Sequence, residues 1–352
     1  MPGVSLVMIA RNEARCIERA LASVRPHVDA MFVLDTGSTD GTPEIARRAG
    51  ARVETFAWCN DFSAARNAAL QRADADWALV LDADEWLVDG AAALLALRGE
   101  PPLYIGVLRV DNLYGADVAH AARSASWLSR VLPRGACYEG RIHEQPPAHW
   151  PRRRLDVTVL HDGYLDGAMR GKQGRNETLL RQALAERPDD LYWHYQLGKD
   201  LELRGRFVQA LPHYQRAHAG AQRDDPWRHD LILRLLFTLK KLGQHARAVD
   251  LAEAEMNAFG DSPDFCFALG DVLLDWAAHD ATRGPQLVPL IESAWQRAVT
   301  IGERPELPDS VQGRGSFLAA HNLAVLYDGL RRADQAQHWR ERERTMRAAA
   351  AA

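Results

Sequence analysis

Short apolar runs alternate with amphipathic segments of helical length over roughly the first 165 residues. The predicted strands are Val4–Ala10, Met31–Leu34, Arg52–Phe56, Trp77–Leu81, Tyr104–Asn112, Arg130–Pro133 and Leu155–Leu160. Helices are predicted over Glu13–Val24 and Asp61–Ala73. Strands separated by helices of about 10–15 residues are typical of βαβ units around a parallel sheet. We therefore expect an α/β domain with a parallel sheet in this part of the chain.

From residue 168 onward the pattern is helical, and it repeats. Gly205 and Ala210 recur 38 residues later as Gly243 and Ala248. The other positions that mark the repeat units are small, aromatic or leucine: Gly198, Tyr214, Ala217, Leu269, Gly270, Trp295, Ala298, Leu323, Ala324, Tyr327 and Ala336. Small residues mark where two antiparallel helices approach closely, and stacked helix pairs bury their apolar faces on one another.

This half resembles the tetratricopeptide repeat family, and we expect an all-α solenoid of four units. The third unit is expected to carry an insertion near Ala281–Pro289, and Pro212 is expected to kink its helix. The predicted domains are residues 1–167 and residues 168–352.

Composition excludes several classes of protein. The chain is 47% hydrophobic and 26% charged, so it is not disordered, and its net charge of −4 disfavours binding to nucleic acid or anionic lipid. No run of about 18 apolar residues predicts a transmembrane helix. The N-terminal stretch lacks the pattern of a signal peptide, and the four cysteines form no CxxC pair. We expect a cytoplasmic protein with free thiols.

The acidic sequence Asp82-Ala83-Asp84-Glu85 directly follows a predicted buried strand. The carboxyl ends of parallel strands form the edge where open α/β sheets bind ligands. Two carboxylates separated by one residue are suitable ligands for Mg²⁺ or Mn²⁺, and such an ion can bridge a diphosphate. A solvated loop or a helix cap is the alternative for this motif taken alone.

Other polar residues follow the neighbouring strands. Asp35 ends the second strand, and the glycines after it permit a tight turn before a helix that begins at Thr42. Arg66 lies on the helix before the fourth strand, where its guanidinium could reach a phosphate. The remaining polar positions of this edge are Arg11, Asn12, Glu13 and Ser38.

Taken in order and spacing, VSLVMIARNEA, VLDTGSTDGT, FSAARNAAL and LVLDADE resemble glycosyltransferase family 2, whose members have the GT-A nucleotide-sugar fold. The resemblance implies a UDP-sugar donor, inversion at the anomeric carbon, and Mn²⁺ or Mg²⁺ as cofactor. It places Asp35 at the uracil and Arg66 near the nucleotide, with Asp84 as a more direct metal ligand than Asp82. The donor-binding residues it implies are Ala10, Arg11, Asn12, Glu13, Asp35, Ser38, Arg66, Asp82, Ala83 and Asp84.

Two later motifs, Gly140–Glu144 and His161–Tyr164, together with the upstream Arg130 and Arg134, resemble the branch with the lipopolysaccharide-core β-1,4-glucosyltransferases. They also resemble the repeat-containing peptide S-glycosyltransferases. That similarity implies Glu144 as the general base and His161 as a third metal ligand. Glu144 could instead hold an ion pair or position substrate, and His161 could be a hydrogen-bonded histidine at a strand end. Rival bases are His143, Asp111 and Glu85.

We therefore expect a metal-dependent inverting glycosyltransferase that moves a hexose from a UDP-sugar to a saccharide, lipid-linked or peptide acceptor. The repeats would bind the acceptor or form a homodimer. A repeat scaffold with an inactive transferase domain is the alternative. It is disfavoured because the candidate site residues are all intact, namely Asp35, Arg66, Asp82, Asp84 and His161. A metal-dependent nucleotidyltransferase is a further alternative, but ARNEA lacks the Gly-rich basic loop those enzymes carry.

Overall fold

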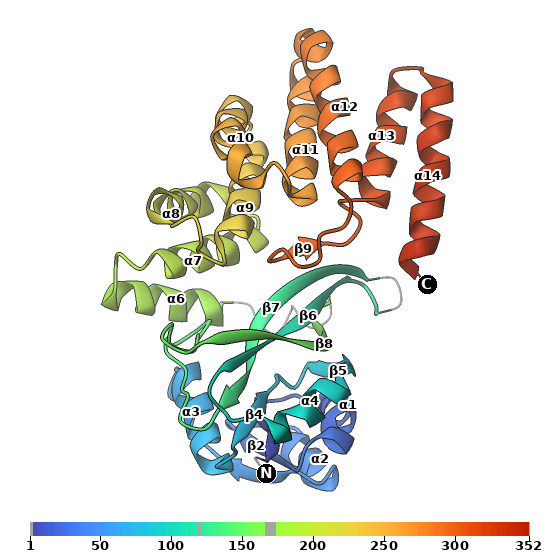
Figure 1. Ribbon diagram of the computed structural model, residues 1–352. Helices are drawn as coiled ribbons and strands as arrows, with labels where there is room; N and C mark the ends of the chain where they lie inside the picture. Colours follow the sequence, from blue (N-terminus) through green and yellow to red (C-terminus); the bar gives the residue numbers. More distant parts are fainter. Residues whose placement is uncertain (1–2, 119–120, 166–173, 352) are drawn as a thin grey trace. The chain divides into compact units, whose positions relative to one another are not determined.

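The computed structural model describes residues 3–118, 121–165 and 174–351. The chain divides into two compact units, Met1–Glu186 and Arg187–Ala352 (Figure 1). The predicted boundary between residues 167 and 168 lies outside the described residues, and helix α6 (Arg175–Glu186) belongs to the first unit. In the described part of the chain, no helix combines the length and the apolar character that a membrane span needs.

A mixed sheet with the strand order β3-β2-β1-β4-β7-β6-β8-β5 forms the centre of the first unit. β1, β2, β3 and β4 are parallel, β7 is antiparallel to β4 and to β6, and β8 runs parallel to β6 and antiparallel to β5. The strands are β1 (Val4–Ala10), β2 (Ala30–Asp35), β3 (Arg52–Thr55), β4 (Trp77–Val80), β5 (Glu85–Asp89), β6 (Ile105–Gly115), β7 (Ala122–Pro133) and β8 (Arg152–Leu165). The helices before α6 are α1 (Ile17–Val24), α2 (Thr42–Arg48), α3 (Phe62–Ala73) and α4 (Ala91–Ala96), with 3₁₀ turns η1 (Arg25–His27) and η2 (Leu97–Gly99).

Both faces of the parallel strands are covered, because alternate residues of β1 pack on opposite sides. Leu6 and Met8 belong to a core cluster with α1, α2 and α4, whereas Val7 and Ile9 pack with α3. Such double coverage produces the continuous apolar runs seen in the sequence. Ala10 of β1 pairs with Asp35 of β2, so the polar residues after these strands meet at the carboxyl edge of the sheet.

The structure confirms the predicted α/β class and shows where the sequence pattern was incomplete. α1 begins at Ile17, later than predicted, because the preceding turn is bound to the next loop: the Glu13 N–H donates to Thr42 Oγ1 (2.8 Å) and the Ala14 N–H to Asp40 (3.1 Å). Strand β5 was not predicted. β7 is longer than the predicted Arg130–Pro133, and its first half was missed because that half is polar.

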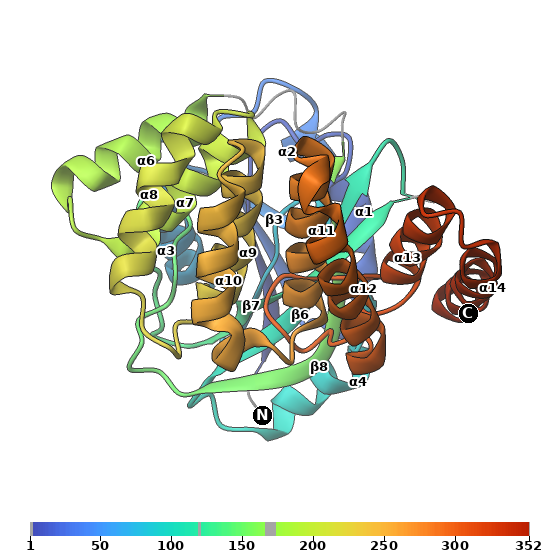
Figure 2. The same ribbon diagram turned by 90° about the horizontal axis from the view of Figure 1, so that it is seen from above.

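The second unit consists of helix pairs stacked in chain order, as the repeats predicted (Figure 2). Its described elements are α7 (Leu191–Leu203), α8 (Phe207–Gly220), α9 (Arg228–Lys241), α10 (His245–Phe259), α11 (Pro263–His279), η4 (Ala281–Arg283), α12 (Gly284–Ile301), β9 (Ser310–Val311), α13 (Phe317–Gly329) and α14 (Ala333–Ala351). The segment of the expected insertion forms η4 and the start of α12. Helix α8 continues through Pro212 as one helix. A Cβ on Gly198 would lie 2.6 Å from the Tyr214 ring, so glycine permits the α7–α8 contact.

Candidate active site at the carboxyl edge of the sheet

The loops after β1 and β2 are bound to one another. The buried Asp35 carboxylate accepts from the backbone N–H groups of Gly37 and Ser38, each at 3.1 Å. The Asn12 N–H donates to Ser38 Oγ (2.9 Å), and Asn12 Oδ1 accepts from the Thr39 N–H (2.8 Å). These residues belong to separate sequence motifs, and the structure brings them together at the sheet edge. The surface that Asp35, Asn12 and Ser38 form there is called the floor of the candidate site.

Two arginines enclose the carboxylate of Asp82. Arg66 on α3 donates to Oδ1 (2.7 Å) and Arg130 on β7 donates to Oδ2 (2.9 Å). Arg130 also bonds Glu85, whose second oxygen accepts from the Asp82 N–H at 3.0 Å. Both oxygens of Glu85 are therefore used to hold the acidic turn in shape, and this residue is 2% exposed.

Burial and charge act in opposite directions on these carboxyl groups. Burial favours the neutral form of Asp82, but the guanidiniums of Arg66 and Arg130 outweigh it and hold the pKa of Asp82 far below its ordinary value of 3.8. At Glu85 burial is the largest effect and raises the pKa despite Arg130. Asp82 is therefore anionic at neutral pH.

Asp84 lies opposite His161 at the same edge. Its Oδ2 is 3.5 Å from His161 Nε2, and both residues are at most partly exposed. The other ring nitrogen, Nδ1, is 2.9 Å from Asn112 Oδ1, and the Asn112 amide donates to Ser126 Oγ at 3.0 Å. Because that amide group donates, Oδ1 is the acceptor, and the proton of a neutral imidazole lies on Nδ1. Nε2 then directs its lone pair to the side of Asp84.

Glu144 is brought to the acidic turn by contacts of the 138–144 loop with α3. The Asn67 side chain exchanges two hydrogen bonds with the backbone of Tyr138 (2.7 and 2.9 Å), and Arg141 O accepts from the Phe62 N–H at 2.8 Å. Glu144 then accepts from Arg66 Nε, the same guanidinium that bonds Asp82. The proposed base and the acidic turn thus share one arginine.

The rival bases differ in their surroundings. Glu85 has both oxygens engaged, as described above. Asp111 is buried and bonded to Arg109 at 2.7 Å. His143 lies next to Glu144 with a positive φ of 52°. These contacts favour Glu144 over Glu85, and the base assignment stays a prediction.

The predicted metal ligands are Asp82, Asp84 and His161, and this assignment stays a prediction. Asp84 and His161 approach each other, whereas Asp82 has both oxygens on arginines. Arg11 is exposed, Glu13 is half-buried, and Ala10 and Ala83 are buried beside the edge.

Sequence reasoning used Arg130 in the family resemblance without giving it a role, and it did not single out Asn112. An arginine directly before the apolar Val131-Leu132 was the available signal for Arg130. Sequence reasoning also missed the ion pairs of the buried Asp162 with Arg15 (2.9 Å) and Arg19 (2.6 Å). These pairs connect β8 to α1 and to the turn before it.

An α/β domain with an acidic turn at its carboxyl edge, joined to a helical repeat unit, is the arrangement that the sequence resemblance implies. Residues 5–110 match the family model described as Glycosyl transferase family 2. The N-terminal part of the chain is therefore a glycosyltransferase family 2 domain.

Three comparisons illustrate the similarity. A TPR repeat-containing protein of Synechococcus elongatus is 34% identical over 271 residues, which is 73% of this chain and 66% of the relative. The SPbeta prophage-derived glycosyltransferase SunS of Bacillus subtilis is 26% identical over 259 residues, which is 71% of this chain and 61% of SunS. The chain thus spans just under two thirds of each relative's length. A crystal structure of glucosyl-3-phosphoglycerate synthase from Mycobacterium tuberculosis with Mn²⁺ and UDP is similar over 32% of this chain and 44% of that chain, with 25% identity and a TM-score of 0.27.

Proposed function

We propose that the first unit transfers a hexose from a UDP-sugar, with inversion, to a hydroxyl or thiol of a saccharide, lipid-linked or peptide acceptor. The observation that carries this proposal is the approach of Asp84 to His161 beside the arginine-bound Asp82. All three lie at the sheet edge where the Asp35 loop also ends. Family membership and the glycosyltransferase relative support the class of reaction.

The donor nucleotide would lie on the floor formed by Asp35, Asn12 and Ser38. The carboxylate of Asp35 is fixed by two backbone N–H groups, so it is positioned before the donor arrives. An oriented carboxylate can accept from the imide N–H of uracil, and it thereby favours that base over one that presents only acceptors there.

The diphosphate would lie beside the arginine cluster. Arg66 Nη1 and Arg130 Nε are buried and have no hydrogen-bond partner among the described residues. Buried donors without partners are costly, and a phosphate oxygen would satisfy them. Arg66 would move little to do so, because Asp82 and Glu144 already fix its guanidinium.

The donor set fits a divalent ion. Asp84 and His161 offer an oxygen and an imidazole nitrogen 3.5 Å apart, and a carboxylate with an imidazole suits Mn²⁺ better than Mg²⁺. The described cluster around this pair holds four carboxylates and two guanidiniums, on Asp82, Asp84, Glu85, Glu144, Arg66 and Arg130. With every carboxylate ionised it has an excess of two negative charges, which one dication would offset. When bound, the ion would stabilise the charge that develops on the leaving UDP.

Glu144 would take the proton of the acceptor. The Glu144 side chain is only 10% exposed and its carboxylate is oriented by Arg66, so it can be held towards one acceptor atom. The second unit would bind the acceptor or a second copy of the chain. Stacked helix pairs present long surfaces that suit extended ligands.

A panel of UDP- and GDP-sugars with Mn²⁺, assayed for release of nucleoside diphosphate with and without acceptor, tests the proposal. Release from one UDP-sugar that stops in EDTA is expected. Activity that survives EDTA would contradict the metal assignment, and no release from any donor would favour the scaffold alternative.

A further inference from the structure

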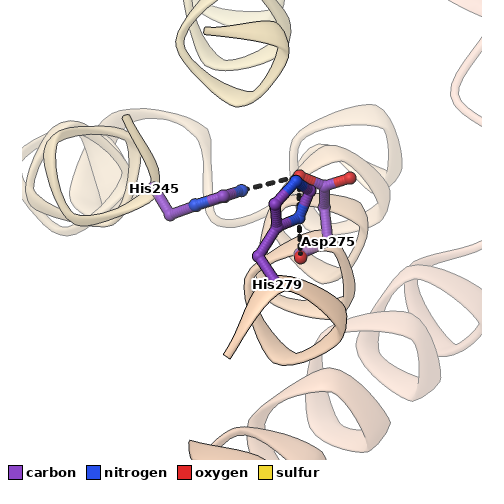
Figure 3. Close-up of side chains that lie close together, drawn as sticks. All are labelled: His245, Asp275 and His279. Carbon is purple, nitrogen blue, oxygen red and sulfur yellow. Dashed lines mark hydrogen bonds and ion pairs between the residues drawn. The ribbon is translucent and has the colours of Figure 1, made fainter. Parts of the chain in front are cut away.

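Two histidines and an aspartate come together in the second unit, between the start of α10 and the end of α11 (Figure 3). His245 is the first residue of α10, and Asp275 and His279 lie one turn apart on α11. One ring nitrogen from each histidine and one carboxylate oxygen lie within 4.8 Å of one another. Figure 3 shows the His245 ring pointing across from α10 towards the other two side chains.

The group is partly organised without any ion. His245 Nε2 is 2.6 Å from Asp275 Oδ2, and His279 Nδ1 is 3.5 Å from the same oxygen. The His245 ring is parallel to Trp276, with 9° between the planes and 6.1 Å between the centroids. His245 is 6% exposed, so its position is set by packing.

The third side chain is accessible. The His279 side chain is 64% exposed, and its Nδ1 bonds the Asp275 carbonyl at 2.8 Å. An ion from solvent can therefore reach the group, and His279 can turn towards it without disturbing the core. Arg283, which stacks on Trp276 at 4.6 Å, is paired with Asp280 at 3.1 Å, so its charge is partly compensated.

Two imidazoles and one carboxylate are the ligand set of a borderline transition-metal dication such as Zn²⁺. Ligand atoms on one tetrahedral zinc ion lie about 3.3 Å apart, given bond lengths of about 2.0–2.1 Å. The present distances bracket that value, and small side-chain rotations would bring the three donors to it. Water would complete the coordination.

We propose that His245, Asp275 and His279 form a binding site for a transition-metal dication, with Zn²⁺ as the best fit, that links α10 to α11. α10 ends the second helix pair and α11 begins the third. An ion bound to both would stabilise the stacking of these pairs, because it binds the folded unit and not separated helices. This site is independent of the transferase proposal.

The test uses the full chain, ZnCl₂ and two measurements: calorimetric titration, and hydrogen exchange with mass spectrometry to locate the response. Zinc is expected to slow exchange in peptides from the α10 start and the α11 end. His279→Gln is expected to remove that local protection. It should also weaken the corresponding zinc-binding step in the calorimetric titration. Changes to residues outside the ligand shell typically weaken metal binding by about 10–100-fold, and the loss of a ligand should exceed that range. Asp275→Asn provides a second variant with the same expected loss.

His321→Gln is the matched control, because His321 is also exposed and also pairs with a single carboxylate, Glu343, at 3.1 Å. It should keep the zinc protection of α10 and α11. If zinc slows exchange in the α10 and α11 peptides equally in His279→Gln and His321→Gln, the proposal is overturned. A wild-type chain in which zinc changes exchange only in peptides of the first unit, where Asp84 and His161 lie, would also overturn it.

Discussion

Replacing Arg130 with methionine should lower the stability of the first unit more than the same replacement of an exposed arginine does. Arg130 is 8% exposed and bonds both Asp82 and the fully buried Glu85. Breaking a buried ion pair by removing one partner costs about 3–5 kcal/mol, because the other charge stays buried without compensation. Asp82 retains Arg66, so Glu85 would carry most of the cost.

Arg134→Met is the matched control. Arg134 follows β7 directly and pairs with Asp74 and Asp76, but all three side chains are substantially exposed. Water can replace these pairs, so the control should lose little stability.

Hydrogen exchange in peptides from β4 and β7 measures the effect within the first unit alone. At about 1.36 kcal/mol per tenfold change, the expected loss of protection is about 10²- to 10⁴-fold for Arg130→Met. Equal losses in the two variants, or none in Arg130→Met, would refute the reasoning.

The pH dependence gives a second check on the same variant. Burial raises the pKa of Glu85 above its unfolded value, so an ionised Glu85 opposes folding above its native pKa and the penalty falls as pH is lowered. Without Arg130 this penalty is larger, so the stability difference from wild type should shrink on acidification. The contribution of Asp82 to the pH dependence has the opposite sign. Because its pKa is lowered in the folded chain, ionised Asp82 stabilises the fold above pH 3.8, and that stabilisation is lost at more acid pH. Adding Glu85→Gln to Arg130→Met should recover part of the loss.

Three further substitutions test the site and the repeats. Asn112→Ala should weaken Mn²⁺-dependent transfer by about 10–100-fold, while Asn112→Asp, which still accepts from His161, should retain most of it; equal losses would remove the orienting role. Glu144→Gln should lower transfer to a hydroxyl acceptor by about 10²–10⁴-fold with UDP-sugar affinity nearly unchanged, and a loss below about tenfold in single-turnover assays would exclude it as the base. Gly198→Ala should cost about 1–3 kcal/mol in urea unfolding through overpacking, whereas Gly284→Ala, where a Cβ meets nothing within 4 Å, should not; similar midpoints would contradict the close contact.

The parts of the fold that were predictable depend on local pattern. β1, β2 and β4 were predictable because continuous apolar runs ended in polar residues. The helix pairs were predictable because small residues recur where helices cross. β5 and the polar half of β7 were not, because their pairing with β8 and β6 comes from tertiary contacts and not from periodicity.

Some residues of the candidate site could be named from the sequence, but their hydrogen bonds and ion pairs could not. Asp82, Asp84 and Arg66 follow from motifs that end or precede strands. The contact between Arg66 and Glu144 joins residues 78 positions apart, and that between Asn112 and His161 joins residues 49 apart. Such contacts depend on strand order, which one sequence does not specify.

Sugar transfer by Asp84→Asn, compared with Asp89→Asn, tests the central claim most directly. Asp89 ends β5 and is exposed, so its variant controls for the loss of a nearby carboxylate. With the UDP-sugar that the panel identifies, Mn²⁺ and acceptor, we predict that Asp89→Asn transfers sugar at the wild-type rate and gives the inverted anomer by NMR. Asp84→Asn should show no measurable transfer at any Mn²⁺ concentration. Wild-type turnover by Asp84→Asn would contradict the assignment of this sheet edge as the metal-dependent active site.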